Sequence, residues 1–238
     1  MSVTTLSPPR PRNIYPDSDG EPMAENPLQF QWIVTTKEGL EYVYRNQPDV
    51  YVAGDMFWYP VEGQPKICQA PDIFVALGRP KAGYRGSYKQ WEEGGIAPQV
   101  VFEILSPGNR PEKLIEKFQF YEKYGVQEYY LYDPHEVVLT GFLRIADQLT
   151  AIPAMDGWVS PLLGVRFDLS GGELTIYGPD GERFLTYQEI ADERDRAVQE
   201  RDRLAQERDR LAQERDQERQ RAERLAAQLR ALGLEPPP

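Results

Sequence analysis

The sequence has little sulfur or imidazole chemistry: its 238 residues include one cysteine, Cys68, and one histidine, His135. One cysteine excludes an internal disulfide framework and any zinc site built from several cysteines. One histidine excludes the metal motifs that need two. The sequence also lacks a Walker phosphate loop, a GxGxxG motif and a Ser/His/Asp triad. The ionisable chemistry that remains is that of carboxylates and lysines.

Long hydrophobic runs are absent as well. No run of 18 apolar residues occurs, so we expect no membrane-spanning helix. The N-terminus has no apolar signal-peptide core. With a single cysteine, these features predict a protein of the reducing cytoplasm. The formal charge is −11, from 27 basic and 38 acidic residues, and such a balance does not attract a polyanion at long range.

Composition divides the chain into four parts. Residues 1–25 are rich in proline and predict a flexible N-terminal arm. Residues 26–187 mix apolar runs, aromatic residues and turn signals, as a folded domain does. Residues 188–233 predict a long charged helix or coiled coil, and residues 234–238 a disordered tail. The helical segment has no lysine and no aromatic residue.

The charged helix contains a seven-residue repeat, because QERDRLA at 199–205 recurs at 206–212. One line of positions at this spacing is mostly apolar, and the neighbouring line is mostly arginine. A seam that is half arginine is weak for a coiled coil. The pattern therefore leaves two interpretations open, a dimerising coiled coil that would make the protein a homodimer and a solvated single helix. The apolar line is Ile190, Ala197, Leu204, Leu211, Leu225 and Leu232.

Apolar periodicity in the folded domain predicts an α/β protein with a mixed sheet flanked by helices. Strand, short helix, strand over 99–132 is a crossover unit, so strands 99–105 and 126–132 should be parallel neighbours. Short strands separated by turns then predict antiparallel strands up to residue 187. The expected helices are 28–45, 111–124 and a short one at 88–93, and the other expected strands are 50–53, 56–59 and 70–77.

Glu103 is the unusual residue of this domain. It lies within Val-Val-Phe-Glu-Ile-Leu, where both faces of a central strand should be apolar. A buried carboxylate must be protonated, paired with a cation or bound to a metal. Asp72 begins a strand expected nearby, and two carboxylates on adjacent strands form an oxygen site that suits Mg²⁺. The alternative is an internal ion pair of Glu103, with Asp72 only ending a turn.

Lys117 is the third candidate. Its helical spacing from Leu114 and Tyr121 places it beside the buried stripe of helix 111–124, so its ammonium could reach the carboxylates. An ordinary surface lysine is the other interpretation, and Lys113 is the fallback. Two carboxylates, a lysine and Mg²⁺ (or Mn²⁺) form the set used in phosphodiester hydrolysis.

Four segments in this order resemble the Uma-two family of restriction endonucleases, which is widespread in bacteria: PDI at 71–73, FEILSP at 102–107, EKFQFY at 116–121 and YGVQEYYLYDP at 124–134. The resemblance covers roughly residues 20–187. It implies the restriction-endonuclease-like fold, the PD-(D/E)XK nuclease superfamily and a metal-dependent endodeoxyribonuclease. Asp72 and Glu103 then become the metal ligands and Lys117 the catalytic lysine.

The sequence departs from the superfamily pattern at Leu105, which stands where the lysine is usual. In this family a lysine from the following helix takes that place, and Lys117 matches it. The superfamily often adds an acid from the first helix region, for which Glu25 and Glu21 are candidates. Asp55 is a further acid near a strand hairpin, where it also suits a plain turn.

Basic residues that could contact DNA phosphates are few. A cluster interleaved with aromatic residues and an arginine after the Glu103 strand are the candidates, although a solvated loop would have the same pattern. The acidic balance and Leu105 favour a second hypothesis, a catalytically weak nucleic-acid-binding or scaffold module that oligomerises through its helical tail. The candidate nucleic-acid-binding residues are Lys81, Arg85, Lys89 and Arg110.

Overall fold

The computed structural model describes residues 14–17, 24 and 26–232. The chain divides into two compact units, Met1–Leu185 and Thr186–Pro238. The first unit contains all strands of the described residues and two helices, and the second contains one long helix.

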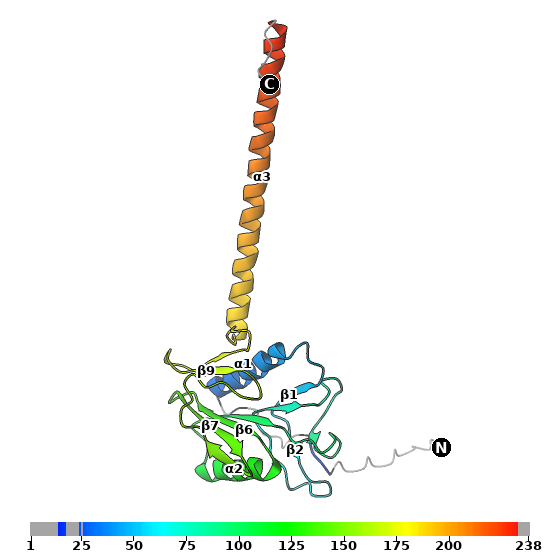
Figure 1. Ribbon diagram of the computed structural model, residues 1–238, viewed down its shortest axis with the longest axis vertical. Helices are drawn as coiled ribbons and strands as arrows, with labels where there is room; N and C mark the ends of the chain where they lie inside the picture. The colour runs from blue at the N-terminus through cyan, green and yellow to red at the C-terminus, as the bar shows by residue number, and fades with distance from the viewer. Residues whose placement is uncertain (1–13, 18–23, 25, 233–238) are drawn as a thin grey trace, which may run out of the picture. The chain divides into compact units, whose positions relative to one another are not determined.

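A six-stranded mixed sheet is the centre of the first unit (Figure 1), with the strand order β1-β3-β5-β6-β7-β8. β5 and β6 are parallel, as the crossover between them predicts, and every other neighbouring pair in this sheet is antiparallel. The strands are β1 (Val50–Gly54), β3 (Ile73–Leu77), β5 (Val100–Ile104), β6 (Glu128–Asp133), β7 (Val138–Ile145) and β8 (Gln148–Ala151).

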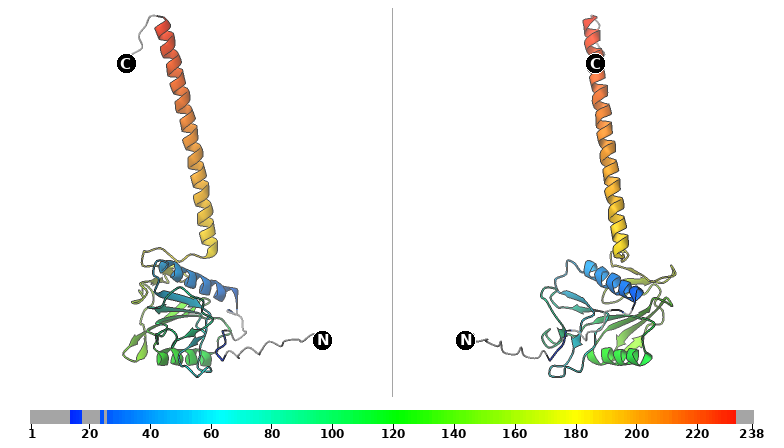
Figure 2. Two further views of the ribbon diagram at one scale, coloured as in Figure 1. Left: turned by 90° about the vertical axis from the view of Figure 1, so that its right-hand side faces the viewer. Right: turned by 180° about the vertical axis from the view of Figure 1, so that it is seen from behind.

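One helix covers each face of this sheet (Figures 1 and 2). Helix α1 (Pro27–Val43) packs Ile33 and Leu40 into one apolar cluster, and α2 (Pro111–Tyr124) packs Phe120 and Tyr121 into another. Because both faces are covered, all five residues of β5 are buried, including Glu103. The buried strand therefore carries a carboxylate into the interior beneath α2.

Local sequence signals set the ends of both helices. The Asn26 side chain accepts a hydrogen bond from the Gln29 N–H at 2.9 Å and caps α1, with a proline following it. Helix α2 begins at Pro111 and ends before Gly125, whose φ of 96° is the left-handed conformation that glycine tolerates. The expected bounds 111–124 are confirmed for α2, and the expected helix 28–45 is found two residues shorter at its C-terminal end.

The short helix expected at 88–93 is wrong. Tyr88 and Lys89 form β4, which pairs in parallel with β2 (Trp58–Tyr59). The Tyr88 N–H bonds to the Phe57 carbonyl at 2.7 Å, so a partner thirty residues away overrides the local pattern. Turns follow up to two glycines with positive φ at 94 and 95.

A second hairpin packs against the cluster beneath α1. It consists of β9 (Arg166–Asp168) and β10 (Thr175–Tyr177), whose Phe167 and Ile176 join that cluster. These strands confirm the antiparallel strands expected before residue 187.

Glu128, the first residue of β6, ties the segment before β9 to the sheet. Its carboxylate is fully buried and accepts hydrogen bonds from the Tyr130 hydroxyl at 2.8 Å, the Ser160 hydroxyl and the Leu162 N–H at 2.8 Å. The buried charge is thus met by three donors rather than by a cation. In the sequence, Glu128 looks like one residue of an apolar strand.

The second unit is helix α3 (Tyr187–Ala231), which is 45 residues long. The Thr186 hydroxyl accepts from the Glu189 N–H, and the Glu189 carboxylate accepts from the Thr186 N–H, so a capping box fixes its start. No residue of α3 is buried. Across the described part of the chain, no helix combines the length and apolarity needed to cross a bilayer.

We expect Glu128→Gln to lower the free energy of unfolding by about 3 kcal/mol, because the amide has one acceptor for three donors. Urea unfolding measures this loss, and the exposed Glu136 provides the matched control Glu136→Gln. A loss below about 1 kcal/mol for Glu128→Gln would contradict the assigned role of Glu128.

Candidate active site

Two carboxylates come together at one end of adjacent strands. Ile73 of β3 pairs with Phe102 of β5, so the same antiparallel register, continued by one residue, places Asp72 opposite Glu103. Asp72 precedes β3 directly and is half-buried, whereas Glu103 is 3 % exposed. The structure therefore brings together the two acids that the sequence singled out.

Helix α2 supplies two partners for Glu103. The Lys117 ammonium donates to Glu103 Oε2 at 2.7 Å, and the Tyr121 hydroxyl donates to Oε1 at 2.5 Å. The two donors are one helical turn apart, so both lie on the face that meets the sheet. Lys117, and not the fallback Lys113, is the lysine of the cluster: Lys113 is exposed and pairs with Glu116.

Asp72 is held by the backbone of the neighbouring strand. Its Oδ2 accepts from the Ile104 N–H at 2.7 Å, which is the one hydrogen bond to this carboxylate from the described residues. Its own carbonyl accepts from the Asp55 N–H at 3.1 Å. Asp55 has a φ of 47° and follows β1 directly, so the expected turn at 54–55 is present and places a third acid beside Asp72.

The cluster has more negative than positive charge. Burial raises the pKa of Asp72 well above its usual value, the Glu103 carboxylate raises it further, and Lys117 lowers it only in part. Burial alone would lower the pKa of Lys117, but Glu103 and Asp72 outweigh it and raise that pKa. Lys117 is therefore a fixed ammonium at neutral pH, and Asp72 is a carboxylate whose charge is incompletely compensated.

A divalent cation fits this donor set. When both carboxyl groups are ionised, one lysine leaves one negative charge, to which Asp55 adds its field. Within residues 14–17, 24 and 26–232, no three His, Cys, Asp or Glu side chains are grouped so as to hold a metal by themselves. Mg²⁺ commonly takes one or two protein carboxylates and fills its other positions with water and substrate phosphate. Asp72 and Glu103 match that requirement.

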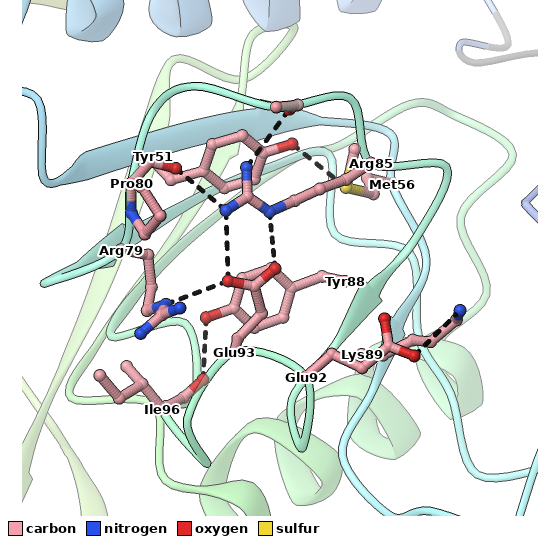
Figure 3. A network of polar contacts seen from close by, with 11 residues as sticks. Tyr51, Met56, Arg79, Pro80, Arg85, Tyr88, Lys89, Glu92, Glu93 and Ile96 are labelled. Carbon is pink, nitrogen blue, oxygen red and sulfur yellow. Dashed lines mark hydrogen bonds and ion pairs between the residues drawn. The ribbon is translucent and has the colours of Figure 1, made fainter.

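The basic cluster predicted to contact nucleic acid is largely occupied within the protein (Figure 3). Arg85 donates to both carboxylate oxygens of Glu93, at 2.6 and 3.2 Å, and Arg79 donates to Glu93 at 3.0 Å. The hydrogen bond from Arg85 lowers the pKa of Glu93. Lys89 pairs with Glu92 at 3.4 Å (Figure 3). A role of these residues in DNA binding stays a prediction.

The remaining candidates have different surroundings. The Lys81 ammonium donates to the Tyr44 carbonyl at 2.8 Å. Arg110 is exposed at the N-cap of α2, immediately after the loop that follows β5. Glu21 and Glu25, the two acids proposed from the first helix region, lie outside the described residues.

Tyr121 and Glu93 are the residues that sequence reasoning missed. Tyr121 was assigned only to the apolar stripe of α2, yet its hydroxyl is buried against Glu103. The signal available was the four-residue spacing from Lys117, which places both polar ends over the same strand residue. Glu93 had no such signal, because its arginine partners come from a loop.

We expect Asp72→Asn to raise the thermal midpoint of the metal-free protein at pH 7. The unfolded carboxyl ionises near its ordinary pKa of 3.8, whereas the folded one keeps its proton to higher pH, so folding is penalised as pH rises between these values. The gain should shrink as the pH falls toward about 4. Thermal unfolding in EDTA at both pH values measures it.

Asp147→Asn, at an exposed turn between β7 and β8, is the control for that measurement. A lower midpoint for Asp72→Asn than for the unmodified protein at pH 7 would show that the Asp72 charge is already well compensated.

Comparison with known proteins gives a family. The model of the Uma2 family, described as "Putative restriction endonuclease", matches residues 31–176, which is more than half of the chain. A crystal structure of a "putative nuclease belonging to DUF820" from Anabaena variabilis is similar at 18 % identity and a TM-score of 0.41, covering 58 % of this chain and 74 % of that one. No curated protein gives a match.

The matched range runs from α1 to β10 and includes the sheet, α2 and all three cluster residues. The mixed sheet with a helix on each face is the restriction-endonuclease-like α/β arrangement expected from the motifs. The chain belongs to the Uma2 family.

Proposed function

We propose that the first unit is a Mg²⁺-dependent endonuclease that hydrolyses DNA phosphodiester bonds, with Asp72 and Glu103 as metal ligands and Lys117 as the catalytic lysine. The observation that carries the proposal is the Lys117–Glu103 ion pair next to a second, undercompensated carboxylate. Membership of a family described as restriction endonucleases supports a nuclease. Mn²⁺ would serve in place of Mg²⁺, since both accept oxygen ligands.

Tyr121 and Lys117 have different roles around Glu103. Tyr121 occupies one oxygen of Glu103 and Lys117 the other, so the carboxylate is fixed in orientation before any ligand arrives. Lys117 also donates to the Ala70 carbonyl at 3.4 Å, which holds its ammonium between the two strand ends. This fixed positive charge can stabilise the charge that develops on a scissile phosphate.

Metal chemistry completes the set. Asp72 and Glu103 would hold the cation, which when bound would supply an activated water and stabilise the leaving oxygen. Lys117 does not act as a proton acceptor in this scheme, because the neighbouring carboxylates raise its pKa and keep it charged. Arg110, exposed beside the loop after β5, is our candidate contact to a backbone phosphate.

A second function is favoured by a specific observation, the pairing of Arg85 and Lys89 with Glu93 and Glu92. With an acidic balance of −11, these pairs leave few cations for a polyanion. A catalytically weak nucleic-acid-binding or scaffold module would have this surface. For either function we propose a cytoplasmic homodimer joined through α3, whose apolar line is half exposed.

Cleavage of plasmid and single-stranded DNA with Mg²⁺ or Mn²⁺ tests the first function. We expect Asp72→Asn, Glu103→Gln and Lys117→Met each to lower the cleavage rate by at least about 100-fold, because the first two remove charged metal ligands and the third removes the positive charge beside the reacting phosphate. Circular dichroism checks that the variants fold.

Lys113→Met is the matched control, since Lys113 lies one turn earlier on α2 and is exposed. It should cleave like the unmodified protein. Activity that survives all three cluster substitutions would place the site elsewhere, and no activity under any condition would favour the binding or scaffold module.

A further inference from the structure

Helix α3 has one apolar line with nothing packed on it within the described unit. Ile190, Leu204, Leu211 and Leu225 recur at multiples of seven residues, and each residue is 52 % exposed. Ala197 lies on the same line, and Glu218 interrupts it. A stripe that repeats every seven residues stays on one side of a helix only if the helix winds about a partner.

Two rows of opposite charge border this line. Glutamate stands three residues after each apolar position and arginine four residues after it, from the first repeat to the fourth. At 100° per residue the glutamates lie roughly 60° to one side of the line and the arginines roughly 40° to the other. The rows are Glu193, Glu200, Glu207 and Glu214, and Arg194, Arg201, Arg208 and Arg215.

The same arrangement is visible as a shallow groove on the helix surface. Apolar and charged side chains line it together. The groove is lined by Leu204, Glu207, Arg208, Leu211, Ala212 and Arg215.

The order of the rows determines how a second copy can pack. When two such helices run parallel about a two-fold axis along their length, the arginine row of each faces the glutamate row of the other. When they run antiparallel, arginine faces arginine and glutamate faces glutamate, which is repulsive. We propose that α3 of two copies pairs parallel and in register, with the apolar lines in contact and the rows as its borders.

Within their own helix, the arginines of this row form only exposed ion pairs. Each pairs with the aspartate that follows it, for example Arg201 with Asp202 at 2.8 Å and Arg208 with Asp209 at 2.7 Å. The side chains of these two example pairs are more than half exposed, and exposed ion pairs of this kind contribute little. A second copy can therefore recruit the arginines at small cost.

Glu218 sets a limit on the strength of the pairing. In a parallel, in-register dimer the two Glu218 side chains meet across the seam, where like charges repel. Because of Glu218, the apolar line is continuous only from Ile190 to Leu211. We therefore expect Glu218 to weaken the association.

This proposal rests on the homodimer proposed above and adds its direction, and it does not depend on the nuclease chemistry. Sedimentation equilibrium of the full chain tests both. We expect a dimer whose dissociation constant rises when NaCl is raised from about 0.05 to 1 M, because salt screens the attraction between opposite rows. An antiparallel dimer would tighten instead, because its rows repel.

Single cysteines report the direction separately. In a Cys68→Ser background, Leu204→Cys and Leu225→Cys should each form an intermolecular disulfide, because an in-register parallel pair brings every position of the line against itself. An antiparallel pair can bring at most one of the two positions against itself. Gln206→Cys, on the opposite side of the helix, is the control and should not cross-link.

The outcomes separate the claims. A monomer at all concentrations overturns the dimer and its direction together and leaves the nuclease proposal standing. A dimer that tightens with salt, or that cross-links at only one of the two positions, overturns the direction alone. Leu204→Asp combined with Leu211→Asp should raise the dissociation constant by at least about 100-fold, and an unchanged constant would place the interface elsewhere.

Discussion

The ion pair between Lys117 and Glu103 is the interaction on which the rest of the site depends. It joins α2 to the central strand β5 at 2.7 Å, and it makes a carboxylate tolerable where all five strand residues are buried. Without the lysine, the cost of burying Glu103 would oppose the packing of α2 on the sheet. The same ion pair therefore positions α2 on the sheet and determines the charge at the end of β5.

Lys117 does not compensate all of the negative charge in the cluster, and this uncompensated charge is the basis for proposing a metal site. One lysine compensates one carboxylate, while Asp72 lies next to both with a backbone N–H as its hydrogen-bond donor. A stable core would pair or replace the second acid. Glu128, on the other face of the sheet, shows what a purely structural carboxylate looks like here: three hydrogen-bond donors meet it. The contrast between half-buried Asp72 and fully buried Glu128 supports a site that binds a cation.

Local sequence signals were sufficient to predict those elements whose structure depends on neighbouring residues. Pro111 and Gly125 bounded α2, and the crossover rule gave the parallel neighbours β5 and β6. Glu103 could be recognised because a charge in an apolar strand is costly. β4 was missed because its pairing with β2 depends on residues far away in the chain. Tyr121 was missed because a tyrosine in an apolar stripe looks like core, and its hydroxyl acquires a role only once Glu103 lies beneath it.

Diffraction from crystals soaked in Mn²⁺, with data collected for anomalous scattering, tests the central claim most directly. The account predicts an anomalous peak about 2.1 Å from carboxylate oxygens of both Asp72 and Glu103, and no such peak in crystals of Asp72→Asn. The Lys117–Glu103 pair should remain in place beside the metal. A peak elsewhere, or an unaltered site with no metal at saturating Mn²⁺, would contradict the account and leave Glu103 as a buried ion pair.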